Sequence, residues 1–278
     1  MSNESKKEAS EPISGKIAKL PQAGELSAID AWWGLVAVVF VLILLLVILR
    51  PDPYGRILTF VEDGIVVTIF ITITTFALTM ILGLICGLGR VSKNRVIYGV
   101  TSVYVEIIRG IPLLVQLLVW YFAVPALIVQ VGNAIHFRPF QQYLANPIVM
   151  AIVGISICYA AYMAEIVRAG IEALPTGQME AARSLGMTKS QSMRYVILPQ
   201  AYRSIMPTIG NEFIALLKDS SLISVVSVAD LTRRGREFLS FSSRPIETYL
   251  MMALLYLLMT LISARIAKIV ENKTKLEK

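Results

Sequence analysis

Long apolar stretches alternate with short polar connections along most of this chain. A first stretch runs from Ala31 to Leu49 without a charged residue, and a second runs from Gly64 to Gly89. Because about 20 helical residues cross the hydrocarbon core of a bilayer, each stretch is long enough to span it as a helix. The residues between them, 50–55, contain two prolines and a glycine and predict a loop.

Four further stretches have the length and hydrophobicity of membrane spans, although they carry charged residues. They run from about Val96 to Val124, Asn146 to Gly170, Ile205 to Val228 and Thr248 to Ile266. The expected fold class is therefore all-α, a polytopic helical membrane protein with about six transmembrane helices. Residues 1–30 are rich in Ser, Lys and Glu and predict a disordered tail, and residues 267–278 predict a basic tail.

The composition agrees with an integral membrane protein, and the basic residues predict its orientation. Apolar residues make up 56% of the chain and charged residues 16%, and the mean hydropathy is +0.68. With the N-terminus in the cytoplasm, 17 of the 26 lysines and arginines lie on the cytoplasmic side, seven lie outside and two lie within spans. Both termini are therefore expected to be cytoplasmic, and the first stretch is expected to be an uncleaved anchor.

The residue inventory excludes several kinds of chemistry. The chain has one histidine, His136, and two cysteines, Cys86 and Cys158, both within apolar stretches. A Cys/His zinc site, a disulfide framework or a histidine-based catalytic triad is not available from this set. The chain also lacks a P-loop motif. We therefore expect no catalytic residue, no metal site and no cofactor bound by this chain.

The polar segment 172–203, between the fourth and fifth predicted spans, is too long for a simple connection and is expected to be structured. Gly177 to Leu185 predicts a short helix with three apolar residues on one face, namely Met179, Ala182 and Leu185. Gly186 predicts its end, and Thr188 to Gln191 form a capping-box pattern that opens a second helix, which Pro199 is expected to stop. Two such helices are equally compatible with simple binding to the membrane surface.

The order of residues in this segment favours a more specific interpretation. Glu180-Ala181-Ala182, then Gly186, then Val196-Ile197-Leu198-Pro199 resembles the signature loop of ATP-binding-cassette importer permeases. Blocks that begin at Tyr104, Ala164 and Gly210 resemble the polar amino acid branch of the same family. The resemblance covers residues 64–266 as a type I permease domain of five spans, to which the helix 31–49 is an N-terminal addition.

The resemblance implies partners and a role for the loop. Segment 172–203 would be the coupling loop on a separate ATPase dimer, which would use ATP and magnesium, with seven residues at the contact: Gly177, Glu180, Ala181, Ala182, Gly186, Leu198 and Pro199. A second permease subunit, identical or homologous, and an extracytoplasmic solute-binding protein would complete the transporter in the bacterial cytoplasmic (inner) membrane. Amino acid substrate and the lipid bilayer are further expected ligands, and nucleic acid is not.

Charges within the predicted spans need an explanation, because an unpaired charge at mid-bilayer costs several kcal/mol. Glu106 and Arg109 stand at i and i+3, so they can pair with each other or line the substrate pathway. Pro112 predicts a kink beside them. The fifth span carries four further pathway candidates: Asn211, Glu212, Lys218 and Asp219. Lys218 either neutralises the two carboxylates or, together with them, offers both signs of charge to a zwitterion.

Two other charged groups lie closer to the membrane surfaces. Glu165 and Arg168 stand at i and i+3 near the cytoplasmic end of the fourth span, where a structural pair is expected. Arg90 at the end of the second span is interpreted as a positive anchor. Four arginines lie in the predicted outer loop after the fifth span, where few basic residues are expected: Arg233, Arg234, Arg236 and Arg244. They are candidates for docking an acidic rim of the binding protein.

The sequence therefore predicts the permease subunit of an ATP-driven amino acid importer, which works as a dimer and is not itself an enzyme. Two alternatives stay open. One is a permease of the same family for another polar solute, such as an opine. The other is a secondary carrier or channel that uses the charges within the spans as an ion relay.

Overall fold

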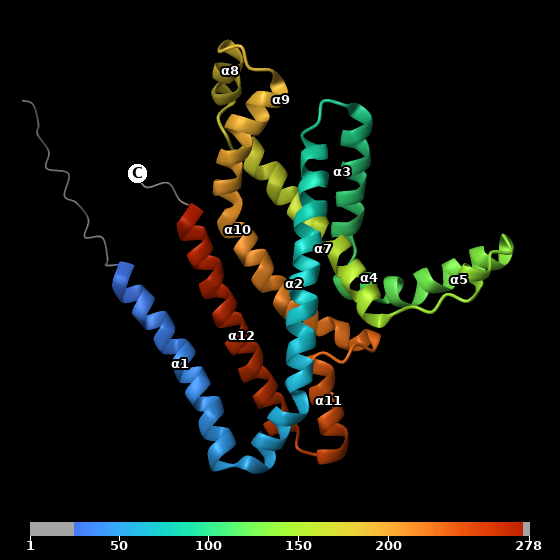
Figure 1. The fold of residues 1–278 in the computed structure, drawn as a ribbon, viewed down its shortest axis with the longest axis vertical. Helices are drawn as coiled ribbons and strands as arrows, with labels where there is room; N and C mark the ends of the chain where they lie inside the picture. Colours follow the sequence, from blue (N-terminus) through green and yellow to red (C-terminus); the bar gives the residue numbers. More distant parts are fainter. Residues whose placement is uncertain (1–24, 275–278) are drawn as a thin grey trace, which may run out of the picture.

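The computed structural model describes residues 25–274, with side chains from Trp32 onward, and these residues form helices and turns without a strand (Figure 1). The long helices are α1 (Glu25–Leu49), α2 (Arg56–Arg90), α3 (Arg95–Gly110), α7 (Pro147–Glu172), α10 (Leu198–Asp219) and α12 (Pro245–Thr274). The shorter helices are α4 (Leu113–Leu118), α5 (Val124–Ala134), α6 (Arg138–Gln141), α8 (Thr176–Ser184), α9 (Lys189–Ser192) and α11 (Leu231–Ser242). Three short π-helical segments are η1 (Pro51–Gly55), η2 (Val119–Ala123) and η3 (Met193–Ile197), and η4 (Ser220–Val226) is a 3-10 helix.

Helices α2 and α7 form the most extensive helix pair of the bundle. Small residues of α2 allow the close approach: a Cβ atom at Gly83 would lie 2.5 Å from the Met163 side chain, and one at Gly87 would lie 2.6 Å from Val167. Four fully buried threonines lie along the same helix, namely Thr68, Thr72, Thr75 and Thr79. Membrane helices pack through such small residues, because lipid supplies no hydrophobic drive for their association.

The α11 segment is fixed to α2 at the end of the bundle opposite α8 and α9 (Figure 1). The backbone N–H of Leu231 donates to Thr68 Oγ1 at 3.1 Å, and Gly64 leaves room for the backbone of Asp230. The buried Asp230 carboxylate accepts hydrogen bonds from the first turn of α11 and caps this helix. Burial raises the pKa of Asp230, whereas these bonds oppose the rise.

Helix α1 lies against α12 (Figure 1). Val39 and Ile43 are buried in this contact, and the Trp32 indole donates to the carbonyl oxygen of Leu261 at 3.3 Å. Helix α1 begins at Glu25, so the end of the predicted 1–30 tail is helical. The rest of that prediction lies outside the described residues. Similarly, α12 continues to Thr274 through most of the predicted basic tail.

Five helical segments among the described residues are long and apolar enough to cross a membrane: Trp32–Leu49, Pro51–Arg90, Leu113–Ala134, Pro147–Glu172 and Pro245–Thr274. Helix α10 also runs through the bundle, but its charged residues lower its hydrophobicity (Figure 1). The expected all-α polytopic architecture is therefore confirmed.

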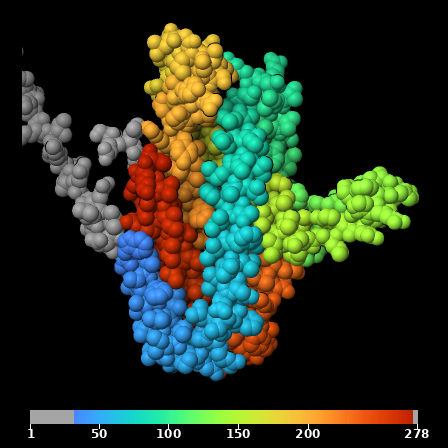
Figure 2. All heavy atoms as spheres, viewed as in Figure 1, coloured from blue at the N-terminus to red at the C-terminus, as the bar shows by residue number. Residues whose placement is uncertain are grey.

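The third predicted span is wrong as a single helix from Val96 to Val124. Helix α3 ends at Gly110, Ile111 adopts an extended conformation with φ −106° and ψ 130°, and α4 begins after Pro112. Pro112 has no amide hydrogen and disfavours helical geometry at the residue before it, so the chain breaks where a kink was expected. Beyond the break, α5 and α6 extend away from the bundle (Figures 1 and 2).

The α2–α7 contact makes a prediction about stability. Replacing Gly83 by Leu is expected to lower the free energy of unfolding by about 1–3 kcal/mol, because the new side chain collides with Met163. Gly99→Leu is the matched control, since no atom lies within 4 Å of a Cβ at that position. Thermal melting of the two purified variants measures the difference, and equal melting temperatures would contradict the proposed close packing.

Candidate functional site

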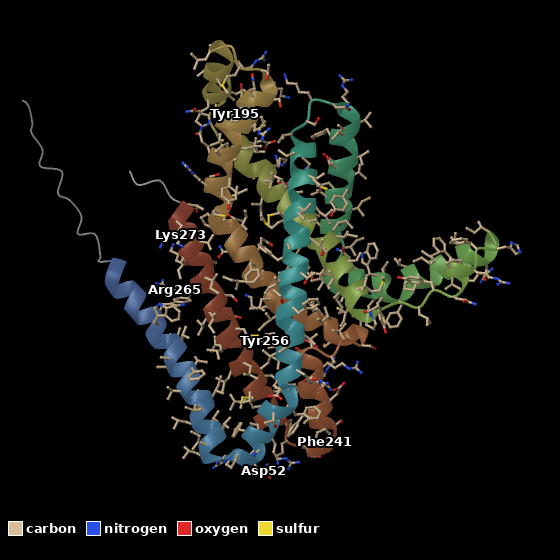
Figure 3. All side chains as sticks on the ribbon, in the orientation of Figure 1. Asp52, Tyr195, Phe241, Tyr256, Arg265 and Lys273 are labelled. Carbon is tan, nitrogen blue, oxygen red and sulfur yellow. The ribbon has the colours of Figure 1, made fainter. Side chains whose placement is uncertain are left out.

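The α8–α9 segment lies at one end of the molecule, beyond the ends of the long helices (Figures 1 and 3). Gly186 has φ +85°, and its N–H donates to the carbonyl oxygen of Arg183 at 3.0 Å. The N–H of Met187 donates to the carbonyl oxygen of Ala182 at 3.3 Å, which completes a Schellman C-cap. The predicted end of the first helix at Gly186 is confirmed, and it requires a residue that adopts positive φ without strain.

The second helix begins as predicted but does not end as predicted. Thr188 and Gln191 form a reciprocal capping box, with N–H to side-chain distances of 2.8 and 3.2 Å. Pro199 does not stop the helix, because it lies in the first turn of α10, where a missing N–H is tolerated. The π-turn η3 joins α9 to α10, so the fifth span begins at Leu198 rather than at Ile205.

The predicted coupling residues of segment 172–203 differ in their exposure. Ala182 is buried, whereas most of the other predicted coupling residues are exposed: Gly177, Glu180, Ala181, Gly186 and Pro199. Leu198 is half-buried. Leu185 is 85% exposed, whereas Ala182 is buried and Met179 is half-buried, so the three apolar residues predicted on one face of the helix do not share a buried face. Helix α8 ends at Ser184, and the cap turns the Leu185 side chain outward.

Tyr195 is a second exposed apolar side chain of this segment that sequence reasoning did not select. It is 64% exposed, and Figure 3 places it at the α8–α9 end, opposite Asp52 and Phe241. A large apolar residue directly before a C-capping glycine was the available signal for Leu185, but no comparable signal marked Tyr195. These two residues give the segment an exposed apolar surface.

A polar cluster lies in the interior where α7 and α10 pack together. The Tyr159 hydroxyl donates to Asp219 Oδ2 at 2.7 Å, and the Tyr159 ring centroid lies 6.1 Å from that of Tyr162. Glu212 lies two helical turns before Asp219 on the same side of α10, and the two carboxylates repel each other. We call Glu212 and Asp219 the acidic pair. The tyrosines were missed, because no spacing within α7 relates them to residues of α10.

Lys218 does not lie between the members of the acidic pair. It is exposed on another side of α10, where it lines a recess of about 520 Å³ between α10, α11 and α12. Hydroxyl groups of η4, α11 and α12 line the same recess: Ser221, Thr232, Tyr249, Tyr256 and Thr260. The interpretation that Lys218 neutralises both carboxylates is therefore wrong, because residues one apart point about 100° from each other around a helix. Asn211 is exposed on α10.

Glu106 pairs with Arg90 rather than with Arg109. Arg90 Nη2 lies 3.6 Å from Glu106 Oε1, and Arg90 Nη1 lies 2.5 Å from Glu165 Oε2. The predicted pair of Glu165 and Arg168 is confirmed by a hydrogen bond of 3.1 Å from Arg168 Nε. Arg90 thus joins α2, α3 and α7 instead of serving only as an anchor, and its side chain is only 10% exposed.

Two backbone carbonyls at the helix break accept hydrogen bonds from Gln116. Its Nε2 atom donates to the carbonyl oxygens of Ile108 and Ile111, each at 2.8 Å. A buried backbone acceptor without a partner is costly, and more so in a membrane. At the break beside Arg109, the carbonyls are therefore hydrogen-bonded to a side chain and are not left facing open space.

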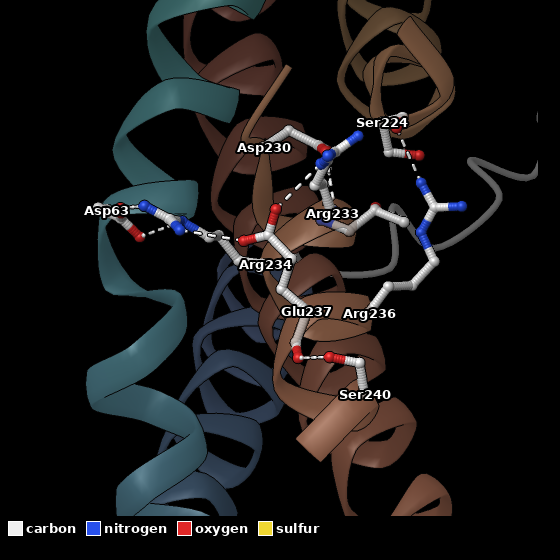
Figure 4. Close-up of polar contacts among 9 residues, drawn as sticks. Asp63, Ser224, Asp230, Arg233, Arg234, Arg236, Glu237 and Ser240 are labelled. Atoms are coloured by element: carbon white, nitrogen blue, oxygen red, sulfur yellow. Dashed lines mark hydrogen bonds and ion pairs between the residues drawn. The ribbon is translucent and has the colours of Figure 1, made fainter. Parts of the chain in front are cut away.

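The four arginines of the α11 region all have partners within the chain (Figure 4 for the α11 residues). Glu237 accepts hydrogen bonds of 3.0 Å from Arg233 and Arg234, which hold its pKa below the usual range. Arg234 also pairs with Asp63, and Arg244 lies 3.0 Å from Asp52. Arg236 donates to the carbonyl oxygen of Ser224 at 2.8 Å. Docking of a binding protein stays a prediction, since internal contacts alone account for these charges.

Comparison with known proteins places these features in a family context. The chain is 34% identical over 214 residues to the glutamine transport system permease protein GlnP of Escherichia coli (strain K12), covering 77% of this chain and 92% of that protein. It is 43% identical over 176 residues to the L-cystine transport system permease protein TcyB of Bacillus subtilis (strain 168), covering 63% and 69%.

Solved structures agree with this similarity. A structure described as "Crystal structure of an amino acid ABC transporter with histidines" superposes with a TM-score of 0.69 at 37% identity and covers 81% of this chain and 97% of its own. The MetNI methionine ABC transporter, in an inward-facing form, shares the fold with a TM-score of 0.65 at 21% identity, covering 80% and 99%. The model of the family described as "Binding-protein-dependent transport system inner membrane component" matches residues 79–276. This chain belongs to that family of multi-pass inner-membrane permeases.

Proposed function

We propose that this chain is the permease subunit of an ATP-driven amino acid importer, in which two permease subunits rest on an ATPase dimer. The observation that carries the proposal is the α8–α9 segment, where Gly186 turns the chain so that Leu185 points away from the bundle. ATP and magnesium would act on the ATPase, and this chain would bind neither. Similarity to permeases named for glutamine and cystine supports an amino acid as the cargo.

Exposed polar and charged side chains on α3 and α10 identify the surfaces that we assign to the translocation pathway. Glu106, Arg109, Asn211 and Lys218 are exposed on α3 and α10. Because a charged side chain in contact with hydrocarbon costs several kcal/mol, these surfaces would contact water or the second permease subunit. The exposed side chains of α1 from Trp32 onward, and those of α2 beyond Gly64, are instead apolar and suit contact with lipid.

We assign the ammonium group of the substrate to the acidic pair. Glu212 and Asp219 form no ion pair with any of residues 32–274 whose side chains are described, so their charge is available to a cation. The Tyr159 hydroxyl fixes the orientation of the Asp219 carboxylate. A carboxylate held in this way binds a cationic nitrogen through charge-assisted hydrogen bonds.

The mechanism that this arrangement supports is alternating access. ATP binding would close the ATPase dimer and draw the two α8–α9 segments together, and α10 would transmit the movement because it follows η3 without a loop. The α8–α9 end, and with it both termini, would be cytoplasmic. A secondary carrier or channel would not need an exposed apolar side chain such as Leu185 on the α8–α9 segment, so this alternative is not favoured.

The coupling role predicts a defect in ATPase binding. Leu185→Ala is expected to weaken the binding of the ATPase subunit about fivefold, because truncating one of the few interface residues that carry most of the binding energy costs more than about 1 kcal/mol. Titration of the purified ATPase onto the permease in lipid nanodiscs measures this affinity. Ser190→Ala, an exposed residue of the same segment, is the control, and an equal affinity for both variants would contradict the assignment.

Binding of the substrate cation by the acidic pair predicts that neutralising either carboxylate impairs transport. Glu212→Gln and Asp219→Asn are each expected to reduce substrate binding by about tenfold or more, since a charge-assisted hydrogen bond contributes about 1.5–3 kcal/mol. Uptake by proteoliposomes that contain the assembled transporter measures the effect. Glu172→Gln, at the exposed end of α7, should transport normally. Unchanged uptake in both variants of the pair would remove these residues from the pathway.

A basic α11 surface would also assist docking of a solute-binding protein. Replacing Arg233, Arg234 and Arg236 together by Gln is expected to weaken that docking and to reduce its dependence on salt. Affinity for the binding protein, measured at two salt concentrations, tests this. Lys268→Gln on α12 is the control, and an unaltered salt dependence would leave these arginines with only their internal contacts.

A further inference from the structure

An open groove runs along α10 between α12 and α2. Figure 2 shows α10 in orange between α12 in red and α2 in cyan. Two recesses, of about 370 and 220 Å³, form the groove, and they are continuous because Phe213, Ser263 and Ile266 line both of them. Ile73 on α2 and Ile266 on α12 are each 56% exposed, so the groove is open along its side.

The lining of this groove is almost entirely apolar. Thr72 and Ser263 are the polar residues among those that line it. The Thr72 hydroxyl already donates to the carbonyl oxygen of Thr68 at 2.7 Å. The groove therefore offers few hydrogen-bonding groups and suits an apolar occupant.

The dimensions of the groove match one hydrocarbon chain. Its lining on α12 extends from Met259 to Val270, a rise of about 16 Å along the helix. The hydrocarbon of one bilayer leaflet is about 15 Å thick, half of the core. A helix about 10–12 Å across and of the same length occupies more than about 1,200 Å³, which exceeds both recesses together. The groove thus has the length and the width for an acyl chain.

Two cations without acidic partners lie beyond one end of the groove. Arg203 precedes Gly210 by seven residues on α10, and Lys273 follows Ile266 by seven on α12, so each lies on the groove side of its helix. The two helices touch between them, since a Cβ atom at Gly210 would lie 3.0 Å from Ala267 Cβ. Both cations therefore lie about 10 Å from this contact, toward the α8–α9 end (Figure 1).

The charges of these two residues are not compensated within the part of the chain whose side chains are described. Arg203 and Lys273 are both exposed, and neither forms an ion pair with any of residues 32–274. Lys268, on the other side of α12, differs because it pairs with Glu271. The groove thus ends at two basic side chains that are available to an anion.

We propose that the groove binds one anionic phospholipid, with an acyl chain along α10 and the phosphate between Arg203 and Lys273. An apolar channel one leaflet long with cations at one end is complementary to this molecule in shape and in charge. Each basic residue near an anionic headgroup strengthens binding about fivefold. The site requires only that the α8–α9 end meets a membrane surface, so it goes beyond the proposed transport function and does not depend on the cargo.

The competing occupant is a helix of the second permease subunit. Membrane helices pack closely through small residues, whereas Ile and Phe side chains line much of this groove. A covering protein would also place Lys273 in an interface, where lysine is depleted. A phospholipid leaves both cations at the headgroup level and fills the groove without a close helix contact.

The experiment measures lipid binding to the assembled transporter by native mass spectrometry in detergent. The lipids are dioleoylphosphatidylglycerol, which is anionic, and dioleoylphosphatidylcholine, which has no net charge. We expect one tightly bound phosphatidylglycerol for each copy of this chain and about tenfold weaker binding of phosphatidylcholine. Arg203→Gln combined with Lys273→Gln should weaken phosphatidylglycerol binding about tenfold to thirtyfold, since two cations are lost.

Two further variants separate headgroup from acyl-chain binding. Lys268→Gln is the matched control for charge, because it removes a cation from the same helix but away from the groove, and it should bind like the unmodified protein. Ser263→Phe fills the junction of the two recesses without a change of charge. It should weaken binding of both lipids about tenfold, as expected when about two methylene groups lose their burial.

Three results would overturn the proposal. One is equal affinity for the two lipids, and another is unchanged phosphatidylglycerol binding by the double arginine and lysine variant. The third is unchanged binding by Ser263→Phe, which would place the bound lipid outside the groove. If Ser263→Phe does not assemble, the variants of the exposed cations still carry the test.

Photocrosslinking identifies the occupant directly. Benzoylphenylalanine in place of Phe213, which lines both recesses, is irradiated in nanodiscs that contain phosphatidylglycerol. We expect an adduct with the mass of the lipid. An adduct with a second permease subunit would show that the groove is a subunit interface and would overturn the proposal, while the transport function proposed above would stand.

Discussion

The cost of a charge in hydrocarbon organises the interior of this bundle. The charge of Arg90 is compensated, because Arg90 pairs with both Glu106 and Glu165. These ion pairs join three helices where α2, α3 and α7 meet. Removing Arg90 would leave Glu106 without this partner, whereas Glu165 would keep its pair with Arg168. The acidic pair differs, because its charge is left unbalanced by the described residues. The same physical rule therefore distinguishes charges that hold helices together from charges that are open to a ligand.

Close packing supplies the rigid part of the molecule. The glycines and threonines of α2 bring α7 and the start of α11 close to one helix, which gives the polar groups a fixed frame. Tyr159 and Tyr162 project from α7 toward α10 and α3, so the geometry of the acidic pair depends on where α2 holds α7. Helix α1 lies on the opposite side, against α12, and does not take part in this arrangement.

Local signals in the sequence predicted local structure well. The turn at Gly186 and the capping box at Thr188 depend on residues within one turn, and both were predicted correctly. Pairings between distant helices were not accessible in this way. Spacing allowed a Glu106–Arg109 pair, yet Arg90 reaches Glu106 from another helix, and Tyr159 reaches Asp219 from a position 60 residues earlier. Pro199 misled for a related reason, because a proline either stops a helix or starts one, and only the preceding π-turn decides which.

The clamp formed by Gln116 has a consequence for how the chain leaves the bundle. One amide group donates to the carbonyl oxygens of Ile108 and Ile111, and the Ile111 N–H also donates to that of Ile108 at 3.4 Å. The polypeptide can thus turn sharply within an oily environment without bare carbonyls, and α5 and α6 take their direction from that corner. The Gln116 side chain thus holds the backbone at the point where the chain leaves the bundle toward α5 and α6.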